Sequence, residues 1–262
     1  MALQPPEPFR SEYAHWQWSV ASEWEDQAAW RLEEPGTRRV LFLKATKLGH
    51  FPTAIDERER LRWARPYLPV PEVIDSGSDE TVDWLLTSAL GGTDATRHAL
   101  LADPARIVPA VARGLAKFHA DAPVDSCPFD FTVATALEHV RRRIREGVAA
   151  PADLHPEYRH LTTLERAVDE LERLTPDHED LVVCHGDYCF PNALLDDDGI
   201  VTGYVDLGEL GVADRWCDIA VAAWSVTWNV GPGWENLFYE SYGVQPDEQR
   251  IEFYRLLYDL AS

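Results

Sequence analysis

Apolar and polar residues alternate along the first part of the chain in three short runs. These runs span residues 15–20, 28–32 and 40–45. Alternation with a period of two is typical of half-buried strands, and Pro35–Gly36 supplies a turn signal between the last two runs. A further apolar run, Trp84–Leu90, ends at Gly91–Gly92. We therefore predict a sheet in this part of the chain and a hinge at the paired glycines.

Beyond the hinge the apolar residues recur at intervals of three and four, the period of a helix. This spacing covers residues 108–118 and 133–144, and Gly147 closes the second run. Helical patterns also span residues 54–65, 161–174, 214–230 and 246–260. The pattern predicts an α+β protein in two parts, an N-terminal part over residues 1–90 with one helix and a mainly helical part over residues 91–262.

Three polar side chains stand at instructive positions in the second part. Asp187 follows His185–Gly186, Asn192 lies five residues later, and Asp206 follows a further apolar stretch. That stretch reads as a hairpin around the turn 196–199, so the chain doubles back and should return Asp206 beside Asn192.

These residue types suit phosphoryl transfer, which needs an oriented hydroxyl and neutralised phosphate oxygens. A carboxylate such as Asp187 can orient the hydroxyl and accept its proton. The oxygens of Asn192 and Asp206 are ligands that Mg²⁺ prefers. The sequence predicts a magnesium-dependent kinase site here, in place of a chance hairpin with acids at its ends.

The segment from Leu181 onwards, with "HGDYCFPN", "VDLGELG" and "DRWCDIA", resembles the aminoglycoside phosphotransferase family, closest to its 3′-phosphotransferase branch. The likeness continues in "RIEFYRLL" near the C-terminus and, more loosely, in "VLFLKA", "ERERLRW" and "DWLLTSALGG". It implies a two-lobed protein-kinase-like fold with an N-terminal antiparallel sheet and a C-terminal helical lobe.

The resemblance also implies residue roles. Asp187 would be the catalytic acid/base residue, with Asn192 and Asp206 as the magnesium ligands. The nucleotide, ATP or GTP, would be bound by the residues Lys44, Glu57, Ser88 and Ala89. In this scheme Lys44 grips the phosphates, Glu57 is its ion-pair partner, and the backbone of the other two faces the nucleobase.

Two regions depart from the family pattern. Where relatives carry a phosphate-binding serine, this chain has Glu25 or Asp26, and an ionised carboxylate would repel phosphate. On the substrate side, acids are largely replaced by Trp224 and Trp228. Two indoles offer stacking area to a ligand, but their spacing of four also fits one buried helix face.

The predicted acceptor pocket takes its residues from three segments. The candidates are Asp153, Glu157, Trp224, Trp228 and Asp259. For the first two, a solvated loop is the alternative interpretation. The chain's formal charge of −21 favours a cationic ligand and disfavours nucleic acid or an anionic membrane as partner, although acidity also serves solubility.

Four cysteines without a C-x-x-C pair form no disulfide framework, and Cys184, His185 and Cys189 have no second ligand pair that would complete a zinc site. With no signal peptide and no apolar run of membrane length, we expect a cytoplasmic protein. The function we predict is transfer of the γ-phosphoryl group of ATP or GTP to a hydroxyl of a sugar-containing antibiotic. The acceptor is an aminoglycoside or another glycosylated antibiotic such as a nucleoside type; the alternative is a non-catalytic kinase-like binding protein.

Overall fold

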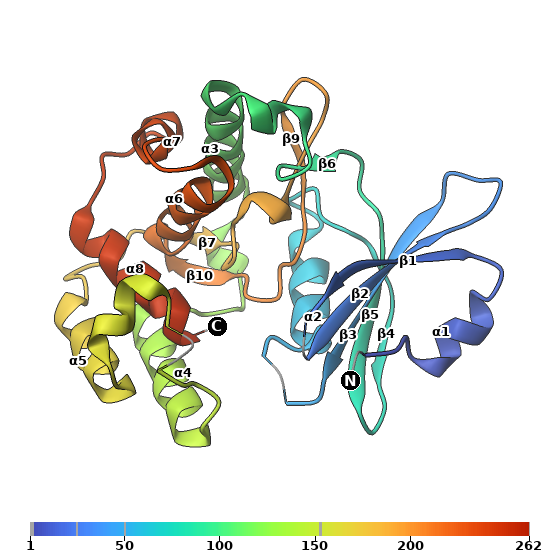
Figure 1. The fold of residues 1–262 in the computed structure, drawn as a ribbon, viewed down its shortest axis with the longest axis horizontal. Coiled ribbons are helices and arrows are strands. Elements are labelled where there is room, and N and C mark those ends of the chain that lie inside the picture. The colour runs from blue at the N-terminus through green and yellow to red at the C-terminus, as the bar shows by residue number, and fades with distance from the viewer. Residues whose placement is uncertain (1–2, 25, 50, 152–153, 262) are drawn as a thin grey trace. The chain divides into compact units, whose positions relative to one another are not determined.

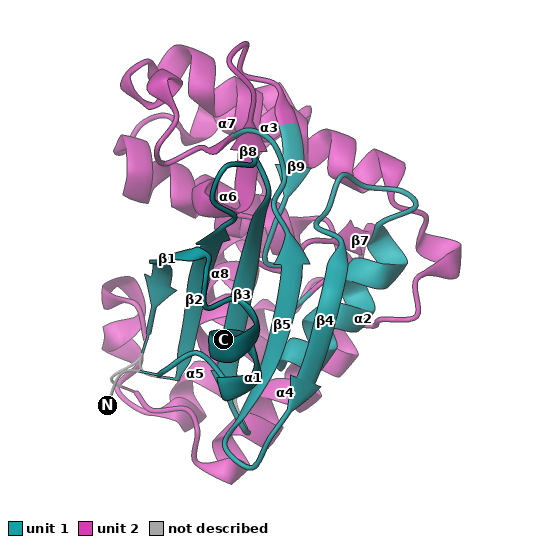
Figure 2. Ribbon diagram, turned by 90° about the vertical axis from the view of Figure 1, so that its right-hand side faces the viewer, with its two compact units in different colours: residues 1–92, 202–209 teal, residues 93–201, 210–262 magenta. Residues whose placement is uncertain are grey.

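The computed structural model describes residues 3–24, 26–49, 51–151 and 154–261. The chain forms two compact units, shown in different colours in Figure 2. Unit 1 comprises residues 1–92 and 202–209, and unit 2 comprises residues 93–201 and 210–262. Unit 1 is built on a sheet and unit 2 mainly on helices, so the chain has the α+β composition that the hydrophobic pattern predicts.

Unit 1 contains a five-stranded antiparallel sheet (Figure 1), and Figure 2 shows its strands in the order β1-β2-β3-β5-β4. Its strands are β1 (Gln17–Glu23), β2 (Gln27–Glu33), β3 (Val40–Lys47), β4 (Val73–Ser78) and β5 (Val82–Ser88). The four predicted strands are confirmed, with ends shifted by up to three residues. Strand β4 was not predicted, because its sequence VIDSGS does not alternate.

Helices cover both faces of this sheet. On β3 the buried residues Leu41 and Leu43 belong to an apolar cluster with Phe9 of the short helix α1 (Glu7–Glu12). The opposite face is packed against α2 (Ala54–Ala64), which contacts β3, β4 and β5. A capping box at Thr53 fixes the start of α2, since the side chains of Thr53 and Asp56 each accept a hydrogen bond from the other residue's backbone N–H.

A segment from the second half of the chain also folds into unit 1. The N–H of Tyr204 donates to the carbonyl of Pro69 at 3.0 Å, and the hydroxyl of Thr202 donates to the carbonyl of Gly91 at 3.3 Å. At Gly208 an added Cβ would lie 2.5 Å from the ring of Pro52, so only glycine fits this close approach. The chain segment that carries Asp206 is therefore part of the N-terminal unit.

Unit 2 is organised around six helices in its described residues. They are α3 (Pro104–Asp121), α4 (Val133–Glu146), α5 (Leu164–Leu174), α6 (Trp216–Val230), α7 (Glu235–Tyr242) and α8 (Glu248–Ala261). Helix α6 is mostly apolar and buried from Trp216 to Val226, and it contacts α3, α7 and α8. The predicted helices are confirmed, except that residues 156–161 form a separate 3-10 turn before α5.

Short strands and turns complete unit 2. Strand β7 (Leu181–Cys184) pairs with β10 (Gly211–Asp214), and β6 (Thr93–Asp94) pairs with β8 (Ala193–Leu195). As predicted, β8 is followed by a tight turn, closed by a hydrogen bond from the N–H of Asp196 to the carbonyl of Ile200, and then by β9 (Val201–Tyr204), which belongs to unit 1 from Thr202 onwards. Among the helices of the described residues, none has both the length and the apolar character needed to cross a membrane.

Candidate active site

In unit 1 a lysine and two carboxylates form a cluster. Alternation along β3 turns Lys44 toward α2, where its Nζ lies 2.9 Å from Oε2 of Glu57. The same Nζ lies 2.6 Å from Oδ1 of Asp206 in the returning segment. The ion pair that the sequence predicts between Lys44 and Glu57 is therefore present, and Asp206 joins it.

The electrostatics of this cluster keep the lysine charged. Burial by itself would lower the pKa of Lys44, but the charges and hydrogen bonds of Asp206 and Glu57 outweigh it, and the pKa is raised. For Glu57, burial raises the pKa, and Lys44 opposes that shift. The side chain of Asp206 remains 44% exposed, and its φ of 63° is left-handed, which is uncommon for a residue other than glycine. The cluster thus presents one carboxylate to solvent from a constrained backbone.

Other expected nucleotide contacts lie elsewhere in unit 1. The N–H of Ser88 donates to the carbonyl of Glu72 and the N–H of Ala89 to that of Val40, so only their carbonyl oxygens remain to face a nucleobase. Asp26 forms an ion pair with Lys47, which neutralises this carboxylate of the β1–β2 loop. Glu25 lies outside the described residues.

In unit 2 the predicted catalytic residue Asp187 lies three residues beyond the end of β7. Its Oδ2 accepts a hydrogen bond from Nδ2 of Asn192 at 3.0 Å, and its Oδ1 accepts one from the hydroxyl of Tyr258 at 3.0 Å. The Asn192 amide also donates to the backbone carbonyl of Asp187 at 2.9 Å. The two residues that stand five apart in sequence are therefore brought together, with Tyr258 as a third member.

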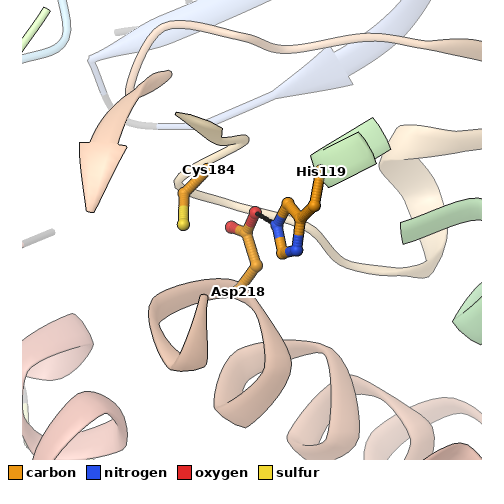
Figure 3. Close-up of side chains that lie close together, drawn as sticks. All are labelled: His119, Cys184 and Asp218. Carbon is orange, nitrogen blue, oxygen red and sulfur yellow. Dashed lines mark hydrogen bonds and ion pairs between the residues drawn. The ribbon is translucent and has the colours of Figure 1, made fainter. Parts of the chain in front are cut away.

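A buried carboxylate anchors the loop that carries Asp187. Asp218 of α6 accepts hydrogen bonds from the N–H groups of His185 and Gly186 at 2.6 and 2.9 Å. Its Oδ2 also lies 2.8 Å from Nε2 of His119 at the end of α3, as Figure 3 shows. Burial would raise the pKa of Asp218, but these partners lower it. Asp218 therefore remains ionised and fixes the two residues before Asp187.

The same group also has the residue types of a metal site. Ligand atoms of His119, Cys184 and Asp218 lie within 4.8 Å of one another (Figure 3). The Asp218 carboxylate already accepts three hydrogen bonds, and Nδ1 of His119 lies 2.8 Å from the hydroxyl of Tyr242. We assign the group to anchoring the loop. His119 itself is buried.

Two of the expected acceptor residues, Trp224 and Trp228, form an aromatic group with His155 in unit 2. Trp224 is 4% exposed, and its ring lies 4.3 Å from that of His155 and 4.9 Å from that of Trp228. Trp228 is 48% exposed. Oδ2 of Asp259 accepts the N–H of His155 at 2.6 Å, and burial raises the pKa of Asp259 against the effect of that bond.

The remaining acceptor candidates differ in what the structure shows. Glu157 is exposed in the 3-10 turn, where its carboxylate approaches the ring of His155 to 4.0 Å. Asp153 lies outside the described residues. Sequence reasoning missed His155 and Tyr258, which lie far from the catalytic motif along the chain and have no local signal of a role.

A two-part α+β fold with a lysine–carboxylate cluster in one unit and an Asp–Asn loop in the other defines a kinase-like phosphotransferase. Residues 18–254 match the model of the phosphotransferase enzyme family. The chain belongs to this family of enzymes. Over 261 residues it is 36% identical to an aminoglycoside 3′-phosphotransferase of Streptomyces fradiae, covering 95% of this chain and 96% of that relative.

Solved structures agree with this assignment. The fold superposes with a TM-score of 0.86 on an aminoglycoside 3′-phosphotransferase of type VIII, which is 34% identical, over 97% of each chain. An aminoglycoside phosphotransferase from Streptomyces rimosus in complex with ADP and streptomycin matches with a TM-score of 0.77 and 27% identity, over 97% of this chain and 96% of that one. The fold of this chain is the kinase-like fold of these enzymes.

Proposed function

We propose that the enzyme transfers the γ-phosphoryl group of ATP or GTP to a hydroxyl of a sugar-containing antibiotic. The observation that carries this proposal is the hydrogen-bonded pair of Asp187 and Asn192 on a loop anchored by Asp218. The pair supplies a carboxylate that can accept a proton and an amide that can bind a metal. The relatives' names support an antibiotic as acceptor, since they include aminoglycoside 3′-phosphotransferases.

In the proposed reaction the acceptor oxygen forms a bond to the γ-phosphorus while the bond from that phosphorus to the β,γ-bridging oxygen breaks. The acceptor hydroxyl donates a hydrogen bond to Asp187, which takes its proton as the new bond forms. Lys44 holds phosphate oxygens of the nucleotide, and its raised pKa keeps it charged for that role. The products are the phosphorylated antibiotic and a nucleoside diphosphate.

Asn192 of unit 2 and Asp206 of unit 1 each offer an oxygen of the kind that Mg²⁺ prefers as a ligand. The Asn192 amide directs its nitrogen to Asp187, which leaves its oxygen on the other branch of the amide. Asp206 offers a carboxylate that is 44% exposed although one oxygen binds Lys44. Asn192 and Asp206 would hold the ion, and Mg²⁺ would neutralise charge on the β- and γ-phosphates. We also propose that the reaction takes place in the cytoplasm, because ATP and GTP are available there.

The acceptor side supports a ligand with fewer ammonium groups than kanamycin. A multiply charged aminoglycoside needs several carboxylates for charge-assisted hydrogen bonds. Here Asp259 is engaged by the N–H of His155, and the exposed indole of Trp228 offers a stacking face. We propose an acceptor that combines a sugar with a flat or apolar group.

One screen tests this function. Purified protein is incubated with Mg²⁺ and ATP or GTP against a panel of aminoglycosides and glycosylated nucleoside antibiotics, and the product is read by a mass gain of one phosphate. Asp206→Ala and excess chelator serve as controls, and each should abolish turnover because the phosphate charges lose their bridging ion.

Three outcomes of the screen are decisive. No mass gain with any antibiotic would reject the proposed function, and full turnover in chelator would reject the metal role. Efficient phosphorylation of kanamycin or neomycin, with kcat/KM in the usual enzymatic range of about 10⁴–10⁸ M⁻¹s⁻¹, would show that the acceptor is a polyamine after all.

A further inference from the structure

The last helix of unit 2 reaches the proposed catalytic carboxylate. Tyr258 lies near the end of α8, 71 residues along the chain from Asp187, and its hydroxyl donates to Oδ1 of that residue at 3.0 Å. On the other side Asn192 donates to Oδ2 at 3.0 Å. Each carboxylate oxygen therefore accepts a hydrogen bond from a neutral donor, and these two bonds restrict rotation of the carboxylate.

The hydrogen bond from Tyr258 restricts the orientation of the Asp187 carboxylate. A carboxylate without the bond to Tyr258 would rotate about its Cβ–Cγ bond, and the acceptor hydroxyl would meet it in fewer productive orientations.

The next residue ties the same helix end to the aromatic group. Asp259 accepts the N–H of His155 at 2.6 Å, and the ring of His155 packs on Trp224 at 4.3 Å. Two consecutive residues of α8 thus contact the catalytic loop on one side and the aromatic group on the other. This arrangement gives the end of α8 a fixed position relative to both.

We infer that Tyr258 is a positioning residue for phosphoryl transfer, acting through the carboxylate of Asp187. The inference rests on the proposed function, because it takes Asp187 as the group that accepts the acceptor's proton. Tyr258 does not bind nucleotide in this scheme. Its loss should therefore reduce the rate of transfer and leave the affinity for nucleotide unchanged.

The chain offers a matched control on the same helix. Tyr254 lies four residues before Tyr258, is 2% exposed, and its hydroxyl has no hydrogen-bond partner among the described residues. Tyr254→Phe removes a hydroxyl from α8 without touching Asp187, whereas Tyr258→Phe removes the one that binds it. Both substitutions keep the ring, so the packing of the helix is preserved.

The experiment is a double-mutant cycle with Tyr258→Phe and Asp187→Asn, measured as kcat and KM with the acceptor found for the wild type. Removing a hydrogen bond to a charged group can lower a rate by roughly 10-fold or more. We therefore expect Tyr258→Phe to lower kcat by that factor and to leave the KM for nucleotide unchanged. Tyr254→Phe should match the wild type. In the Asp187→Asn background, Tyr258→Phe should cause no further loss.

Two kinetic results would overturn the inference. One is wild-type kcat in Tyr258→Phe. The other is an equal fold-loss in both backgrounds, which would indicate a structural role for the tyrosine. Crystal structures of the wild type and Tyr258→Phe provide a readout that needs no acceptor, because a carboxylate of Asp187 in the same orientation in both would also reject positioning. Failure of the proposed function would appear differently, as absence of phosphorylated product with the wild-type enzyme.

Discussion

Two charged clusters take part in the proposed reaction, and the structure holds them in different ways. In unit 1 Lys44 is fixed by ion pairs with Glu57 and Asp206. In unit 2 Asp187 accepts hydrogen bonds from the neutral groups of Asn192 and Tyr258. A lysine that binds phosphate must keep its charge, and nearby carboxylates ensure that. An adjacent cation lowers the basicity of a carboxylate that must accept a proton. Neutral donors orient the carboxylate with a smaller effect on its basicity.

The strongest test of this contrast removes the carboxylate of unit 2. Asp187→Ala should lower kcat by roughly 10²–10⁴, the range for losing a positioned general base, while the melting temperature stays near that of the wild type. Asp187→Asn keeps the shape of the side chain and should lower kcat by a similar factor, because the amide cannot act as a general base. Steady-state kinetics with either variant near wild type would remove Asp187 from its proposed role.

The second test separates packing from acceptor binding in the aromatic group of unit 2. Trp224→Ala should cost about 3–5 kcal/mol of unfolding free energy, because a buried indole leaves a cavity. Trp228→Ala should change stability little but raise the acceptor KM by roughly 10-fold, since a lost aromatic contact and its area are worth about 1–3 kcal/mol. Denaturant titrations and kinetics on both variants measure this. An unchanged acceptor KM for Trp228→Ala would argue against an aromatic acceptor platform.

The third test breaks the ion pairs of unit 1. Lys44→Met should destabilise the fold by roughly 3 kcal/mol, because it leaves the Glu57 carboxylate buried beside Asp206 without its cation. The control is Lys47→Met on the same strand, whose pair with Asp26 has both side chains more than 40% exposed and should be worth less than about 1 kcal/mol. Equal unfolding free energies for the two variants would show that burial does not distinguish these pairs.

The smallest expected effect concerns pH and the end of α8. His139 lies 3.0 Å from the carbonyl of Ala261, and burial lowers its pKa from the ordinary value of 6.5, an effect that the bond to this carbonyl opposes. A histidine whose pKa is lowered in the folded state contributes stability at pH values above the unfolded pKa of 6.5. This stability is lost as the pH falls through the folded pKa.

The wild type should therefore lose more unfolding free energy than His139→Gln as the pH is lowered from about 8 to about 5. His160→Gln, at an exposed position, is the control and should follow the wild type. Parallel stability curves for the wild type and His139→Gln would contradict this linkage.

The elements that the sequence predicted are those with long regular patterns. Strands β1, β2 and β3 alternate with a period of two, β5 is a continuous apolar run, and helices α3, α4 and α5 show a clear period of three to four. Short elements such as α1, β6, β7 and α7 have too few residues for a period to be recognised. Their backbone conformation is set by packing. Phe9 of α1, for example, lies in the apolar cluster with Leu41 and Leu43 of β3.

The candidate site divides in the same way. The pairing of Asp187 with Asn192 follows from a spacing of five residues within one loop, and the ion pair of Lys44 with Glu57 joins a strand to the next helix. The departures from the family pattern, such as the acidic β1–β2 loop, were also visible in the sequence. The ion pair of Asp26 with Lys47, which neutralises part of that loop, could not be predicted, because it depends on the register of two strands.

By itself the sequence determined the longer strands and helices, the residue types of the phosphoryl-transfer motif and their local spacing, because these depend on periodicity and on neighbours along the chain. The tertiary structure decided which distant residues meet. It brings Asp206 into contact with Lys44, 162 residues away, and Tyr258 into contact with Asp187, 71 residues away. It also buries Trp224 and leaves Trp228 exposed. Such contacts depend on how whole elements pack, and no short-range pattern encodes the direction in which a packed helix presents a single side chain.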